Sequence, residues 1–135
     1  MKRRLWKAAG WLLPLAVMAT SGGCLAAAAG AGAAGGIYLS DQGASGIVNG
    51  PVEQVVGRTP GVLSSMGIQV TNHATDDNGA EHTWEGTQGD MQVKVEVKRE
   101  SATTTRVSAS ARKNMAEYDK DYAQQIVTRI ASAGS

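Results

Sequence analysis

Apolar and polar residues alternate most regularly over residues 91–97 and again over residues 107–111, with an apolar residue at every second position of each segment. This period of two predicts strands that have one buried and one solvated face. The apolar positions of the two clearest strands are Met91, Val93, Val95 and Val97, then Val107, Ala109 and Ala111. Upstream, residues 68–88 alternate more weakly around the turn sequence Asp76-Asp77-Asn78-Gly79, which is typical of a hairpin. We therefore expect three or four antiparallel strands in this half of the chain.

Two other segments carry apolar residues at helical spacing. One begins after Pro51 and ends near Gly67, with a kink predicted at Pro60. The other repeats Tyr118, Tyr122, Ile126 and Ile130 at steps of four. Ile47 and Val48 form a further short strand candidate before the first helix. The predicted order of elements along the chain is therefore strand, helix, three or four strands, helix. We predict an α+β fold: a small antiparallel sheet with two helices packed on one face.

The first 23 residues have the three parts of a secretory signal peptide. Four basic residues stand within the first seven positions, residues 8–18 are apolar, and small residues follow. The apolar run is shorter than the roughly 20 residues that a transmembrane helix needs. We therefore expect residues 1–23 to be removed as a signal.

The single cysteine stands directly after this segment, in the sequence Ser21-Gly22-Gly23-Cys24. This sequence resembles a bacterial lipobox, in which the cysteine receives a diacylglyceryl group, although leucine is more common at the position of Ser21. The alternative is an ordinary cleavage site at Ala26-Ala27-Ala28. We favour lipidation of Cys24, because the only cysteine of the chain lies just behind the apolar run, after Gly22-Gly23. Two or three acyl chains would make a stable membrane anchor. Leu25 follows in place of the aspartate that retains such lipoproteins in the inner membrane, so the resemblance implies the outer membrane.

The sequence after the cysteine divides the mature chain in two. Residues 25–36 contain only alanine, glycine and one leucine, which favours a tether. A helix that packs through its glycines is the alternative. We predict a lipidated tether over residues 24–43 and a single α+β domain over residues 44–132.

Charge and cysteine content exclude several classes of function. The full chain has a net charge of +1, but without the four N-terminal basic residues nine basic residues face twelve acidic ones. A chain with a negative net charge is a poor candidate for binding nucleic acid, whose phosphates are also negative. One cysteine excludes a disulfide framework and a cysteine-rich zinc site.

A distributed set of residues resembles one known family. The segments that carry it are Cys24 with its Ala/Gly run, Ile37-Tyr38-Leu39, Ile47-Val48-Asn49-Gly50, and Ala111-Arg112-Lys113-Asn114 through Tyr118-Asp119-Lys120-Asp121-Tyr122-Ala123. They are similar to a small bacterial lipoprotein family, domain-of-unknown-function family 3568. The resemblance implies an envelope lipoprotein of unassigned activity, and it supplies no site residue beyond Cys24.

Candidate catalytic and metal-binding groups are few. Five possible ligands lie within ten residues, namely His73, Asp76, Asp77, Glu81 and His82. They flank a polar hairpin turn without tight spacing, so we expect no metal there. No serine stands in a nucleophile elbow and no phosphate-binding glycine loop is present, so we expect no catalytic residues and no cofactor.

Two surface features remain open to more than one interpretation. Trp84 is expected in the core, with a ligand-stacking platform as the alternative. Lys94, Lys98, Arg106 and Arg112 share one face of two strands, interleaved with Glu96 and Glu100. We expect a mixed surface with cross-strand ion pairs, with contact to anionic lipid head groups as the alternative.

These features together predict a lipid-anchored protein of the bacterial envelope, at the periplasmic face of the outer membrane, without enzymatic activity. The expected partner is the membrane, through Cys24. Whether another envelope protein also binds is left open, as is the oligomeric state. A periplasmic small-ligand-binding module is the first alternative. An envelope hydrolase with an unrecognised site is the weaker one.

Overall fold

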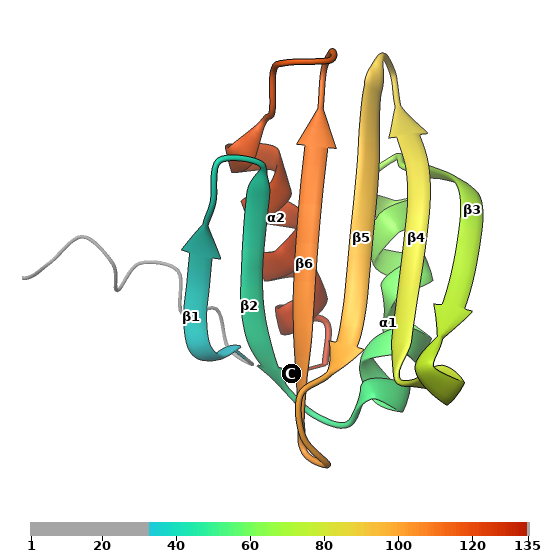
Figure 1. Ribbon diagram of the computed structural model, residues 1–135, viewed down its shortest axis with the longest axis vertical. Helices are drawn as coiled ribbons and strands as arrows, with labels where there is room; N and C mark the ends of the chain where they lie inside the picture. Colours follow the sequence, from blue (N-terminus) through green and yellow to red (C-terminus); the bar gives the residue numbers. More distant parts are fainter. Residues whose placement is uncertain (1–32, 135) are drawn as a thin grey trace, which may run out of the picture.

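A computed structural model describes residues 33–134, which form a six-stranded antiparallel sheet and two helices (Figure 1). Four strands follow the first helix, and the strand order across the sheet is β1-β2-β6-β5-β4-β3. The predicted α+β class and the antiparallel sheet are confirmed, with one more strand at the N-terminal side. In chain order, the elements are β1 (Ala33–Leu39), β2 (Gly43–Asn49), α1 (Val52–Ser65), β3 (Gln69–Asp76), the short 3-10 turn η2 (Asp77–Gly79), β4 (Glu81–Gln88), β5 (Met91–Arg99), β6 (Thr104–Arg112) and α2 (Lys120–Ser132).

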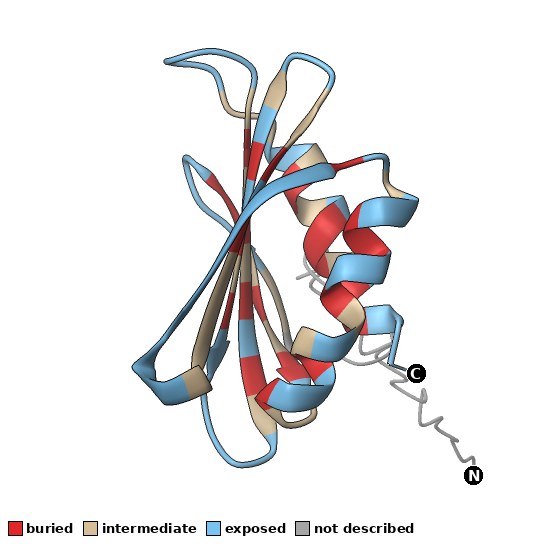
Figure 2. Ribbon diagram, turned by 90° about the vertical axis from the view of Figure 1, so that its right-hand side faces the viewer, coloured by how far each residue is buried: buried red, intermediate tan, exposed pale blue. Residues whose placement is uncertain are grey.

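Both helices lie on one face of the sheet and leave the other face bare (Figure 2). α2 packs over β1, β2 and β6, whereas α1 lies over the half of the sheet that contains β5 and β3. The core between the layers is aliphatic, because alternate strand positions bring valine and alanine under the two helices. Its largest fully buried apolar side chains are Leu63, Ile126, Ile130, Val48, Val52, Val55, Val95, Val97, Val107 and Val127.

The predicted alternation in the central strands is confirmed by the register. Val95 of β5 lies opposite Trp84 of β4 and Ala109 of β6, and all three side chains are buried on the helix-covered face. Lys94, one position earlier, is exposed on the bare face. The bare face is therefore lined by the polar half of each strand.

α1 forms as one helix from Val52 to Ser65. It starts after Pro51, a position at which the missing N–H of proline costs no hydrogen bond. Pro60 lies inside it on the exposed side and does not divide it. The hydroxyl of the buried Thr59 donates to the carbonyl oxygen of Val55 at 2.7 Å. Gly67 follows the helix with a φ of +75°, which allows the chain to turn into β3.

The start of α2 is set by a side-chain cap. One carboxylate oxygen of Asp119 accepts a hydrogen bond from the backbone N–H of Tyr122 at 2.9 Å, which satisfies a donor left free in the first helical turn. Asn114 caps a separate turn instead, since its side-chain oxygen accepts from the N–H groups of Ala116 and Glu117. The helix therefore begins at Lys120, and Tyr118, the first residue of the predicted helical repeat, lies before it and pairs with Arg112.

The sheet begins at Ala33 and not at residue 44, where the domain was expected to start. β1 pairs antiparallel with β2, and Ile37 packs against the core. The Ala/Gly-rich composition does not predict this strand, because most of its residues pair with β2 through the backbone and have no large side chain that would give an alternating pattern. The predicted signal peptide, Cys24 and the first part of the predicted tether lie outside the described residues. Neither α1 nor α2 has the length and apolar character needed to cross a membrane.

Candidate functional site

The bare face of the sheet carries a concave surface lined mostly by polar residues. Two adjoining hollows, of about 480 and about 250 Å³, share Gln42, Lys94 and Ser110 in their walls. The larger hollow also receives Arg112 from the end of β6 and Tyr118 from the segment before α2. We call the larger one the Lys94 hollow. It lies toward the upper end of the sheet in Figure 1, where β4 and β6 end and β5 begins.

The strand register explains why two cations meet in this hollow. Lys94 lies opposite Ser110 on β6, and Arg112 lies opposite Gln92 on β5. Lys94 and Arg112 are therefore diagonal neighbours on the bare face of two adjacent strands, a separation that long side chains can bridge. One guanidinium nitrogen of Arg112 donates to the amide oxygen of Gln92 at 2.7 Å, which fixes the guanidinium at the wall.

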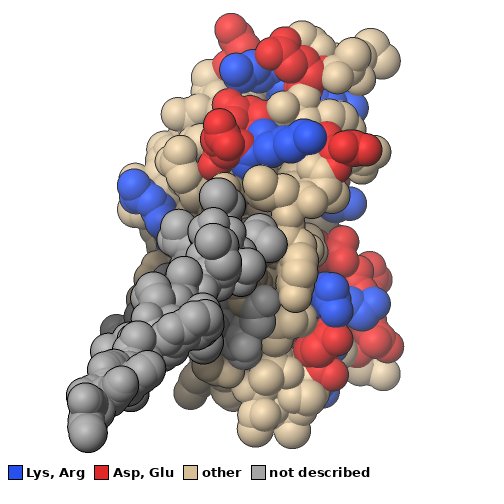
Figure 3. Space-filling view, turned by 90° about the vertical axis from the view of Figure 1, so that its left-hand side faces the viewer, with Lys and Arg blue, Asp and Glu red and all other residues tan. Residues whose placement is uncertain are grey.

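Most cations elsewhere on the domain are neutralised by a carboxylate. On the β1 side of the molecule, basic side chains lie beside acidic ones (Figure 3). The expected cross-strand ion pair is found between Lys98 and Glu81, whose N···O distance is 3.2 Å on directly opposed residues. The other pairs in the described residues are Arg99–Glu53, Arg106–Glu100, Lys113–Asp119 and Lys120–Asp41.

Lys94 and Arg112 differ from these paired cations. All twelve acidic side chains lie within residues 33–134, and none of them comes within 4 Å of the Lys94 ammonium or the Arg112 guanidinium. The hollow contains one carboxylate, that of Glu85, which accepts a hydrogen bond from the amide of Asn72 at 3.3 Å. The four basic residues of the predicted stripe thus separate into a paired half and a half that lines the hollow.

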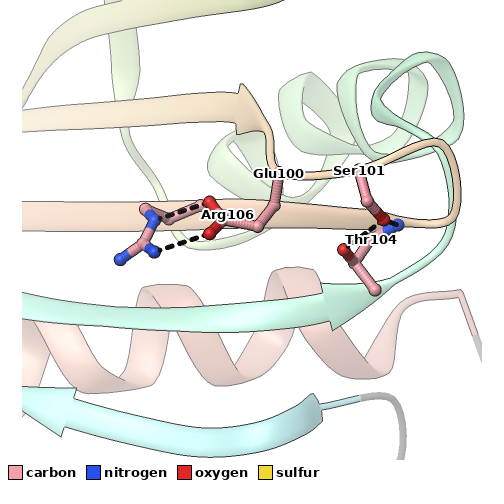
Figure 4. A network of polar contacts seen from close by, with 4 residues as sticks. All are labelled: Glu100, Ser101, Thr104 and Arg106. Atoms are coloured by element: carbon pink, nitrogen blue, oxygen red, sulfur yellow. Dashed lines mark hydrogen bonds and ion pairs between the residues drawn. The ribbon is translucent and has the colours of Figure 1, made fainter.

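A network of polar side chains lies at the opposite end of the sheet, at the β5–β6 turn (Figure 4). Two guanidinium nitrogens of Arg106 donate to the two carboxylate oxygens of Glu100, each at 3.0 Å. These hydrogen bonds and the positive charge of Arg106 lower the pKa of Glu100. The same hydrogen bonds and the negative charge of Glu100 raise the pKa of Arg106. Next to them, the hydroxyls of Ser101 and Thr104 lie 2.7 Å apart. This network joins neighbouring strands and leaves no free cation at that end of β6.

The hairpin of β3 and β4 places the predicted histidines together. Nε2 of His73 lies 3.1 Å from Nδ1 of His82, close enough for one hydrogen bond between the rings. Glu81 is engaged with Lys98 instead. Among residues 33–134, no group of three or more His, Cys, Asp or Glu side chains has the placement to hold a metal ion. Trp84 is buried, as expected for a core residue.

Sequence reasoning identified the two cations of the hollow but not the hollow itself. The basic stripe indicated Lys94 and Arg112 as neighbours on one face, which the register confirms. Gln42 and Tyr118 come from connecting segments, and no periodic pattern in the sequence relates them to β5. Their contribution depends on how the β1–β2 turn and the segment before α2 fold over the end of the sheet.

The chain matches the model of a family described as "Protein of unknown function (DUF3568)" over residues 9–132. The chain belongs to this family. The DUF3568 match covers every helix and strand described above, so the resemblance suggested by the distributed sequence segments is confirmed for the family itself. No curated protein matches the chain.

Proposed function

We propose that this chain is a lipid-anchored protein of the bacterial envelope whose domain serves as a non-enzymatic binding module. The anchor is Cys24, and the domain faces the periplasm from the outer membrane. The observation that supports this most directly is the position of the only cysteine, nine residues before the first residue of β1. A segment of nine residues reaches at most about 30 Å even when it is fully extended. The anchor therefore holds the domain close to the membrane surface.

The arrangement of the charged residues relative to the start of β1 supports a binding role. Ala33, where β1 begins, pairs with Val48 near the end of β2. The neighbouring ends of β5 and β6 carry Arg99 and Arg106, each paired with a carboxylate. Because these cations are neutralised, we favour ion pairing at this end over direct contact with anionic lipid head groups. The Lys94 hollow lies toward the other end of the strands, away from Ala33.

The residues that line the hollow favour ligand binding over catalysis. Its wall offers an ammonium, a guanidinium, carboxamides, hydroxyls and one carboxylate, that of Glu85, which accepts a hydrogen bond from Asn72. No histidine or cysteine is among the described residues that line it. Hydrolases that use a nucleophile need a base within hydrogen-bond reach of it. A periplasmic module for a small ligand is accordingly the second candidate function, and it uses the same hollow.

Lipidation is tested by metabolic labelling with palmitate. We expect the label in the wild-type chain and its loss in Cys24→Ser, while Ser21→Ala keeps it. Equal labelling of Cys24→Ser contradicts the anchor. Outer-membrane placement is tested by density-gradient fractionation, and co-migration with inner-membrane markers contradicts it.

A further inference from the structure

We propose that the Lys94 hollow binds a polyhydroxylated oxyanion, that is, a sugar acid or a sugar phosphate, with its anionic group held between Lys94 and Arg112. The inference rests on the proposed role as a binding module and names the ligand class of that site. It is carried by two cations on one concave surface, neither of which has a carboxylate within 4 Å, although Glu85 lies opposite Lys94 in the register.

The two cations suit an oxyanion in complementary ways. The Arg112 guanidinium is planar and already oriented by its hydrogen bond to Gln92 at 2.7 Å, and a guanidinium can hold two oxygens of a carboxylate or phosphate at once. Lys94 adds a compact charge from the adjacent strand. Charge-assisted hydrogen bonds of this kind are about twice as strong as neutral ones.

The rest of the wall indicates what the oxyanion is attached to. The hollow measures about 480 Å³, whereas small-molecule sites span about 300–1,000 Å³, so a bare phosphate ion would leave most of it unfilled. Gln42, Ser110 and Tyr118 supply carboxamide and hydroxyl groups, each of which can donate to or accept from a sugar hydroxyl. Glu85 stands in the same wall and disfavours a second negative charge. The occupant is thus a polar ligand with hydroxyls and one anionic end.

The test is a titration of the full chain, purified from membranes in a nonionic detergent, with glucuronate, glucose 6-phosphate and glucose at constant ionic strength. Backbone amide chemical shifts report the site. We expect saturable shifts of amides around Lys94 and Arg112 with at least one of the two acids and none with glucose. The acid that binds more tightly distinguishes a carboxylate from a phosphate ligand.

Variants separate this site from general charge attraction. Removing one charge-assisted contact with Lys94→Gln or Arg112→Gln should weaken binding about tenfold or more. Lys94→Arg should restore most of it, because the charge is kept. Lys98→Gln is the matched control: it removes a cation from the same face of the same strand, outside the hollow, and should change affinity by less than about twofold.

Three results would overturn the proposal: no shift at the hollow with either acid, equal shifts with glucose, or equal weakening in Lys98→Gln. Each is independent of palmitate labelling at Cys24. If the chain takes up palmitate but neither acid shifts the amides of the hollow, the lipid anchor is supported and the ligand class is wrong. If the chain takes up no palmitate but binds the acids, the ligand class is supported and the anchor is wrong.

Discussion

The imidazole of His73 lies parallel to the indole of Trp84, with ring centroids 4.6 Å apart and an angle of 4° between the planes. The two residues are directly opposed on β3 and β4. Trp84 is 3% exposed, whereas His73 lies on an exposed edge strand. The histidine therefore covers the outer side of a core tryptophan at the edge of the sheet.

This relationship predicts unequal effects of truncation. Trp84→Ala should lower the free energy of unfolding by about 3–5 kcal/mol, because a large buried side chain leaves a cavity. His73→Ala should lower it by about 0.5–1.5 kcal/mol, the contribution of one aromatic pair. Denaturant unfolding followed by far-UV circular dichroism measures both. Equal losses would show that Trp84 depends on the edge strand for its burial.

A second prediction concerns the two faces of β5. Val95→Asp should prevent folding, since Val95 is fully buried and the carboxylate would have no partner. Lys94→Asp, one residue away on the bare face, should change the free energy of unfolding by no more than about 0.5 kcal/mol. Thermal unfolding of the two variants measures the difference, and similar losses in both would contradict the described register.

Replacing each of two glycines by alanine is expected to change the stability of the domain in opposite directions. A Cβ added to the buried Gly43 would overlap the carbonyl oxygen of Ala109 on β6, and overpacking of this kind costs about 1–3 kcal/mol. A Cβ on Gly57 meets nothing within 4 Å, and alanine in a helix is favoured over glycine by about 0.5–1 kcal/mol. Gly43→Ala should therefore destabilise the domain and Gly57→Ala should stabilise it. The reverse order of melting temperatures would contradict this packing of β2 against β6.

Gly43 also illustrates what sequence patterns can and cannot predict here. The alternation of Val93, Val95 and Val97 predicted a strand and its buried face correctly, because long-range packing and local periodicity agree there. The first four residues of β1 and the first four of β2 have small side chains and no alternation, so their pairing rests on backbone hydrogen bonds that no sequence pattern predicts. The Lys94 hollow depends on two connecting segments, and their placement is a property of the folded sheet.

The ion pair at the β5–β6 turn predicts a pH dependence. The pKa of Glu100 is lowered by hydrogen bonds from Arg106 and by its charge, with a smaller effect of Lys98. A lowered folded-state pKa means that this carboxylate stabilises the fold above its unfolded-state pKa. That stabilisation is lost as the pH falls through the lower folded-state value. Arg106→Gln should raise the titration midpoint of the Glu100 carboxyl carbon in NMR, and Lys98→Gln should raise it less. An unchanged midpoint in Arg106→Gln would contradict the bidentate contact.

The last prediction is that the histidine pair is not a metal site. Nε2 of His73 and Nδ1 of His82 are 3.1 Å apart, but among the described residues no third ligand joins them, and zinc sites in proteins use three or four protein ligands. A metal bound only to the folded state adds about 2.7 kcal/mol at a hundredfold excess over its dissociation constant. We therefore expect the same melting temperature with zinc, with calcium and with a chelator. His73→Ala and His82→Ala should differ from the wild type only by their packing loss, equally in all three conditions. A rise in melting temperature with zinc that disappears in both variants would show that the β3–β4 hairpin binds metal.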